Sequence, residues 1–103
     1  MNCFRGDVVL LPIPFTDLTS HKVRPAIVVG GNGPDLFLVP ISSVLANTGF
    51  PLKEWRAAGL NVQCGVKAQI ATVENQLVVK VVGKLAAADL QTLDERLRLW
   101  LEL

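Results

Sequence analysis

The stretch KVRPAIVVGGNGPDLFLVPIS, residues 22–42, decides the fold. It holds two apolar runs, 24–29 and 36–41, on either side of the glycine- and proline-rich segment 30–34. β-Branched residues in such runs favour strands, and clusters of Gly, Asn and Pro favour turns. The stretch therefore predicts two successive strands joined by a turn, with Pro40 marking an edge strand or the end of the second strand.

The flanking segments extend this β-rich pattern. Residues 6–11 are another apolar run that ends at Pro12, and residues 12–23 have the composition of a loop. Beyond the stretch, residues 42–49 predict a polar connection. Four more strand candidates follow, the first two weaker and the last two a pair joined around residues 74–76: 50–55, 60–64, 66–73 and 77–82.

The pattern changes at Ala86, after which Thr92 is the only β-branched residue. Ala86 offers no capping side chain, but Asp89 would favour the positive end of a helix dipole. Helical spacing predicts one amphipathic helix with an apolar stripe formed by Leu90, Leu93, Leu97, Trp100 and Leu101. Five or more short strands followed by one helix predict the α+β class, with a small barrel-like sheet that the helix covers.

Length and composition indicate a single domain over residues 1–103. Hydrophobic residues make up 50% of the chain and charged residues only 18%, against about 25% charged in an average soluble domain. Such a chain has either an unusually complete core or an apolar surface that another chain covers. We expect a homodimer, because small soluble oligomers are most often twofold dimers.

The charge is distributed unevenly along the chain. Residues 1–85 carry eight basic and five acidic side chains, net charge +3, whereas residues 86–103 have a net charge of −2. A body of this charge can hold a few phosphates of a short single strand, but it differs from strongly basic proteins that coat a duplex.

Several classes of function are not expected. No apolar stretch approaches the ~18–20 residues that cross a bilayer, and the first seven residues do not resemble a signal peptide, so we expect a cytoplasmic protein. Cys3 and Cys64 lack zinc-site spacing and are expected to be free thiols. Phosphate-binding glycine motifs and a serine nucleophile elbow are absent, and carboxylates and histidines are too scattered for a metal site. We therefore expect neither a cofactor nor a metal.

Two positions at strand ends could hold a phosphate. Arg24 precedes Pro25, which stiffens the backbone, and a guanidinium matches phosphate oxygens with two parallel hydrogen bonds. Alternatively, Arg24 is a surface arginine paired with Asp17. Ser42 and Ser43 could donate to a phosphate oxygen, or they could only cap a local turn.

Other candidates are weaker. His21, the only histidine, could transfer protons near neutral pH or could simply be a solvated loop residue. Phe15, Phe50 and Trp55 could stack on bases, although core packing is the favoured interpretation for Phe50 and Trp55. Trp100 belongs to the helix stripe and is expected to pack in the core or at an interface.

In order and spacing, these segments resemble the PemK/MazF family of toxin endoribonucleases over nearly the whole chain. The resemblance is carried by residues 5–10, 12–18, 22–29, 39–43, Gln69 and 82–85, of which 22–29 is the most specific. It implies an SH3-like barrel with a C-terminal helix, a homodimer and a partner antitoxin. It also implies metal-independent cleavage of single-stranded RNA at short sequence motifs.

The resemblance also assigns roles to residues. It implies that Arg24, in the Arg-Pro-Ala motif, is the principal catalytic residue and that Ser42 assists it, where the family often has threonine. Asp17 and His21 both stay open as the acid or base. The RNA-binding residues would be Phe15, Thr16, Lys22, Ser43 and Gln69.

The reaction implied by this resemblance uses the RNA as its own nucleophile. The 2′-hydroxyl would attack the adjacent phosphate and leave a 2′,3′-cyclic phosphate and a 5′-hydroxyl. Two other functions stay open, because one fold can host different activities. The chain could be a toxin that poisons a protein target such as a topoisomerase, or an inactive binding or regulatory module.

Overall fold

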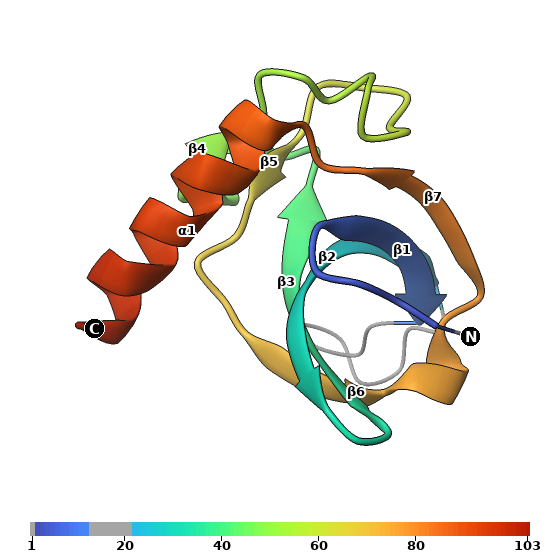
Figure 1. The fold of residues 1–103 in the computed structure, drawn as a ribbon. Helices are drawn as coiled ribbons and strands as arrows, with labels where there is room; N and C mark the ends of the chain where they lie inside the picture. Colours follow the sequence, from blue (N-terminus) through green and yellow to red (C-terminus); the bar gives the residue numbers. More distant parts are fainter. Residues whose placement is uncertain (1, 13–21) are drawn as a thin grey trace.

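The computed structural model describes residues 2–12 and 22–103. Figure 1 shows a strongly curled sheet with one helix along its side. The elements, in chain order, are β1 (Asp7–Pro12), β2 (Val23–Asn32), β3 (Asp35–Ser42), the 3-10 helix η1 (Leu45–Asn47), β4 (Phe50–Pro51), β5 (Gly65–Val66), β6 (Ala71–Glu74), the 3-10 helix η2 (Asn75–Leu77), β7 (Lys80–Lys84) and α1 (Ala87–Leu101).

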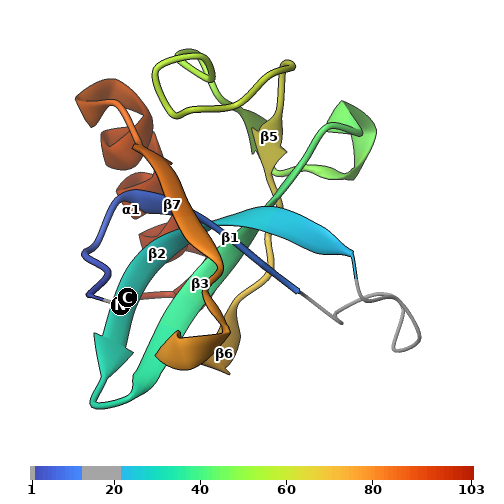
Figure 2. The ribbon, with the colours of Figure 1, turned by 90° about the vertical axis from the view of Figure 1, so that its right-hand side faces the viewer.

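The strands form one seven-stranded sheet with the order β4-β5-β3-β2-β1-β7, and β6 also pairs with β3. Every pairing is antiparallel. The sheet curls as in a small barrel, although the pairing path stays open between β4 and β7 (Figures 1 and 2). The predicted α+β class, with a barrel-like sheet and a C-terminal helix, is confirmed.

The three central strands are buried on both faces because alternate side chains enter two apolar clusters. Val8, Ile27 and Val39 belong to the cluster under α1, whereas the neighbouring residues Val9 and Val28 belong to a second cluster. Burial on both faces requires apolar residues at successive positions. It therefore accounts for the uninterrupted apolar runs in this part of the sequence.

Helix α1 covers the first cluster through Leu93, which is fully buried, and through the half-buried Leu90, Leu97 and Trp100. Leu101, predicted in the same stripe, is 49% exposed, because the last turn extends beyond the sheet (Figure 1). That part of the prediction is wrong. Within the described ranges, no helix is long and apolar enough to span a membrane.

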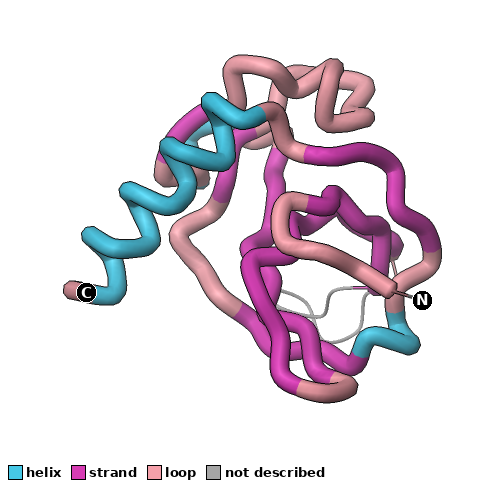
Figure 3. Tube along the Cα trace, viewed as in Figure 1, coloured by secondary structure: helices cyan, strands magenta, loops and turns pink. Residues whose placement is uncertain are grey.

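Two strand candidates are wrong or much shortened. Residues 60–64 form no strand, and the candidate 50–55 is reduced to β4. Between β4 and β5 the chain makes a long loop, residues 52–64, which lies beside the start of α1 and the end of β7 (Figure 3). Contacts to those two elements hold this loop, so its conformation depends on residues that are distant in sequence.

The last two strands exist but do not pair with each other. β6 pairs with β3 and β7 pairs with β1, because η2 carries the chain from one side of the sheet to the other. Pro40 is also not on an edge, since β3 has neighbours on both sides. It lies between the residues of β3 that pair with β6 and those that pair with β5, where a missing N–H breaks no ladder.

Candidate active site

A pocket of about 390 Å³ opens where β2 and β3 separate. Their pairing ends at Ala26 and Pro40; beyond this point β2 follows β1, while β3 turns to pair with β5. The polar lining residues are Arg24, Ser42, Ser43 and Asn61. Much of the remaining lining is apolar and comes from Leu10, Pro25, Ile41, Leu60, Val62 and Val82.

Pro25 helps to keep the two strands apart. The carbonyl of Pro40 accepts a hydrogen bond from the N–H of Lys67 at 2.9 Å, on the side of β3 away from β2. Hydrogen-bonded and non-hydrogen-bonded pairs alternate along an antiparallel ladder. Ala26 and Pro40 form a non-hydrogen-bonded pair, so the next pair of β2 and β3 would have to be hydrogen-bonded. Pro25 occupies that position in β2 and has no N–H to donate. The ladder stops there, and the space between the strands becomes the pocket.

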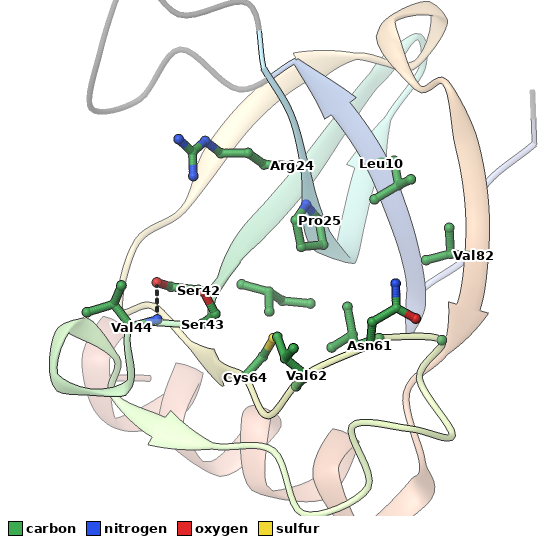
Figure 4. A pocket seen from close by; sticks show the side chains of 13 residues that line it. Leu10, Arg24, Pro25, Ser42, Ser43, Val44, Asn61, Val62, Cys64 and Val82 are labelled. Atoms are coloured by element: carbon green, nitrogen blue, oxygen red, sulfur yellow. Dashed lines mark hydrogen bonds between the residues drawn. The ribbon is translucent and has the colours of Figure 1, made fainter.

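Arg24 lies at the rim of this pocket. Its side chain is exposed, and its guanidinium has no hydrogen bond or ion pair with the part of the chain that the structure describes. Figure 4 shows the guanidinium reaching outward beyond Pro25, on the same side of the pocket as Ser42. The alternative partner, Asp17, lies outside the described residues. The strand therefore presents to solvent a guanidinium that has no partner among the described residues.

Ser42 ends β3 and is half-buried at the same end of the pocket. Its Oγ accepts a hydrogen bond from the N–H of Val44 at 3.0 Å, which turns the chain out of the strand (Figure 4). A hydroxyl can accept and donate at once, so its proton stays available to a ligand. Ser42 can therefore form the turn and donate a hydrogen bond to a phosphate at the same time.

The electrostatic character of the pocket favours an anion. Arg24 is the one cationic side chain of the lining, and no carboxylate is among the described residues that form it. Apolar side chains line the pocket beside these polar groups. The arrangement suits a phosphate attached to a flat apolar body.

The other predicted residues are more scattered. Ser43 lines the pocket, and Lys22 is exposed immediately before β2. Gln69 is half-buried between β5 and β6 and does not line the pocket; its N–H donates to the carbonyl of Lys67 at 2.9 Å. Phe15, Thr16, Asp17 and His21 lie outside the described residues.

Phe50 is buried in the cluster under α1, and Trp55 packs against that cluster. Their packing agrees with the favoured interpretation of the sequence. Neither lines the pocket.

One wall of the pocket, formed by residues 59–64, is not predicted by the sequence. Asn61 and Val62 line this wall and are exposed, and Cys64 lies buried at its end. The Cys64 thiol donates to the carbonyl of Val62 at 3.2 Å, and burial raises its pKa, so it is protonated at neutral pH. The only sequence signal for this wall was a polar residue between Leu60 and Val62, in a segment read as a strand.

Neither cysteine forms a disulfide, as predicted. The described part of the chain contains no group of three or more His, Cys, Asp or Glu side chains that could hold a metal ion.

Known proteins resemble this chain in sequence and fold. Endoribonuclease MazF9 of Mycobacterium tuberculosis (strain ATCC 25618 / H37Rv) is 28% identical over an alignment of 114 positions that covers 96% of each chain. An endoribonuclease solved in complex with its cognate antitoxin, from a mycobacterial species, shares the fold with a TM-score of 0.73 at 19% identity. That match covers 100% of this chain and 97% of the other. The model of one family matches residues 4–101. The chain therefore belongs to the family of PemK-like, MazF-like toxins of type II toxin–antitoxin systems.

Proposed function

We propose that the chain is an endoribonuclease toxin that cleaves single-stranded RNA at short sequence motifs without a metal ion. The observation that supports this most is that Arg24 and Ser42 line one open pocket that has no carboxylate among its described lining. Family membership and the relative named as an endoribonuclease support the same class of reaction.

In the proposed reaction, the RNA 2′-oxygen forms a bond to the adjacent phosphorus and the bond from phosphorus to the 5′-oxygen breaks. A base removes the 2′-hydroxyl proton, and the leaving 5′-oxygen gains a proton, which gives a 2′,3′-cyclic phosphate and a 5′-hydroxyl. Asp17 and His21 are the two candidates for this proton transfer. The protein then needs no nucleophile of its own.

The chain contributes by orienting the phosphate and stabilising its developing negative charge. Arg24 would donate two hydrogen bonds to non-bridging oxygens, and the Ser42 hydroxyl would donate a third. Phe15, Thr16, Lys22 and Ser43 would hold the flanking RNA. Gln69 lies away from the pocket and would reach only a longer substrate.

The proposed partners are a second copy of the chain and a cognate antitoxin. Apolar side chains such as Phe4, Leu99 and Leu103 are 66%, 70% and 88% exposed, and a partner could cover them. The antitoxin would be a short segment with acidic and apolar residues. Light scattering of the purified protein, with and without the antitoxin, tests both assemblies. We place the protein in the cytoplasm, where its RNA substrate would be.

The decisive experiment incubates the purified protein with a long RNA in EDTA and identifies the end groups of the products. We expect cleavage in EDTA. We also expect Arg24→Ala to reduce it by about 10²–10³-fold, the usual cost of losing one charge-stabilising donor. Arg98→Ala is the matched control, because Arg98 is an exposed arginine on α1 that does not line the pocket.

Cleavage at the wild-type rate by folded Arg24→Ala would overturn the assignment of this residue. Cutting of a DNA analogue, which lacks the 2′-hydroxyl, would overturn the mechanism. A wild-type protein that arrests growth but leaves RNA intact would instead support a toxin that acts on a protein target. A protein that does neither would support an inactive binding module.

A further inference from the structure

The end of the pocket away from Arg24 carries one polar side chain, that of Asn61. Figure 4 shows Asn61 beside Leu10 and Val82, across the pocket from Arg24 and Ser42. Asn61 is exposed, and its amide has no hydrogen bond with the described part of the chain. An amide that stands among apolar neighbours without a partner is well suited to bind the polar edge of a ligand.

The backbone that carries Asn61 is held closely against β7. Gly59 has φ +87°, and a Cβ at Gly59 would lie 2.3 Å from the carbonyl oxygen of Val82. A Cβ at Gly83 would likewise lie 2.3 Å from the carbonyl oxygen of Ala58. The two backbones therefore approach more closely than any side chain would permit.

The rest of the loop is anchored to α1 and to itself. The Asp89 carboxylate accepts hydrogen bonds from the N–H groups of Lys53 at 3.0 Å and Glu54 at 2.9 Å. At the other end, the N–H of Leu52 donates to the carbonyl of Cys64 at 2.9 Å. The backbone on both sides of Asn61 is thus anchored before any ligand binds, which favours a residue that discriminates between ligands.

A single nucleotide would match the order of these groups. With its phosphate at Arg24 and Ser42, the sugar and base would extend over Pro25 and Ile41 towards Asn61. The volume of about 390 Å³ lies in the range of small-molecule sites. A base in this position would lie beside apolar side chains and would meet the Asn61 amide at its far edge.

We propose that Asn61 reads the Hoogsteen edge of a purine adjacent to the scissile phosphate and favours adenine there. An Asn amide presents one acceptor and one donor side by side; on this edge they match the N6 amino group and N7 of adenine in a bidentate pair, whereas guanine presents two acceptors. This inference rests on the proposed nuclease function and names the residue that sets part of its sequence preference.

The test is to digest a random-sequence single-stranded RNA library with the wild type, Asn61→Ala and Gln63→Ala, and to sequence the new ends. Gln63 is the matched control, because it is an exposed amide in the same loop that does not line the pocket. We expect the wild type to prefer adenine at one position next to the cut. This preference should fall by about 5- to 150-fold in Asn61→Ala, as for the loss of a bidentate base contact, and should persist in Gln63→Ala.

The melting temperature and the cleavage of sites without adenine distinguish a residue that reads a base from one that only stabilises the fold. Asn61→Ala should keep the wild-type melting temperature, since the amide bonds to nothing in the described chain, and its loss of cleavage should be confined to sites with adenine at the preferred position. Adenine preference retained in Asn61→Ala, or absent next to the cut in the wild type, overturns this inference alone. A wild-type protein that cuts no RNA overturns the nuclease proposal itself.

Discussion

Removing the Asp89 carboxylate should destabilise the protein far more than removing a surface carboxylate from the same helix. Asp89 is 2% exposed, and its two oxygens accept the N–H groups of Lys53 and Glu54. Asp89→Ala leaves both donors without this partner. Each unsatisfied donor costs about 1–3 kcal/mol, and the lost charge at the helix N-terminus costs a further ~0.3–1 kcal/mol.

Lys53 and Glu54 are exposed residues, so water can partly replace the carboxylate, which places the expected loss at about 2–4 kcal/mol. Asp89→Asn keeps one acceptor and should lose roughly half as much. For a domain of this length, each kcal/mol lowers the melting temperature by roughly 4–8 °C. Both variants should therefore remain measurable by urea denaturation followed by circular dichroism.

Asp94→Ala provides the comparison. The Asp94 carboxylate pairs with Arg5, but the two side chains are 38% and 49% exposed. An exposed pair of this kind contributes about 0–1 kcal/mol. If Asp89→Ala loses no more stability than Asp94→Ala, the loop is not held by this carboxylate and the account of its anchoring is wrong.

Further predictions concern the close backbone contact at Gly83 and the buried thiol of Cys64. Gly83→Ala should lower the free energy of unfolding, measured by urea denaturation, by about 1–3 kcal/mol, because its Cβ would meet the Ala58 carbonyl. Gly30→Ala, whose Cβ would make only ordinary contact with Phe37 at 3.6 Å, should cost much less, and the reverse ranking would contradict the close approach. Burial raises the pKa of Cys64, so in a Cys3→Ser background it should react with iodoacetamide more slowly than free cysteine at the same pH. Because the thiolate is disfavoured in the folded state, stability should fall as the pH rises above about 8.5, the ordinary thiol pKa. Reaction as fast as free cysteine, or stability unchanged in alkali, would mean that the thiol is not buried as described.

The central strands were predictable because burial on both faces leaves a continuous apolar run that is visible in the local sequence. The runs around Val8, Ile27 and Val39 are apolar at every position, and the glycine-rich turn between β2 and β3 has a local signal. The turn nevertheless comes later than expected, since Gly30 and Gly31 belong to β2 and pair with residues of β3. Arg24 could be singled out because Pro25 restricts the chain at the start of a strand.

The loop at residues 52–64 could not be predicted in the same way. Its conformation depends on Asp89 and Gly83, which follow it in sequence and act through hydrogen bonds and close backbone contact. Periodicity detects neither interaction. Asn61 is a single polar residue in a segment with the composition of a strand, and this local signal does not indicate a pocket wall.

The anchoring of this loop by Asp89 has a consequence for the order in which the molecule matures. A ribosome synthesises α1 after all the strands, so residues 53–54 lack the carboxylate that holds them until the helix has been made. The rim bearing Arg24 and Ser42 needs only the early strands, whereas the facing wall is secured when the helix docks. The two groups proposed to hold the scissile phosphate could thus be in place before the wall that is proposed to select the base.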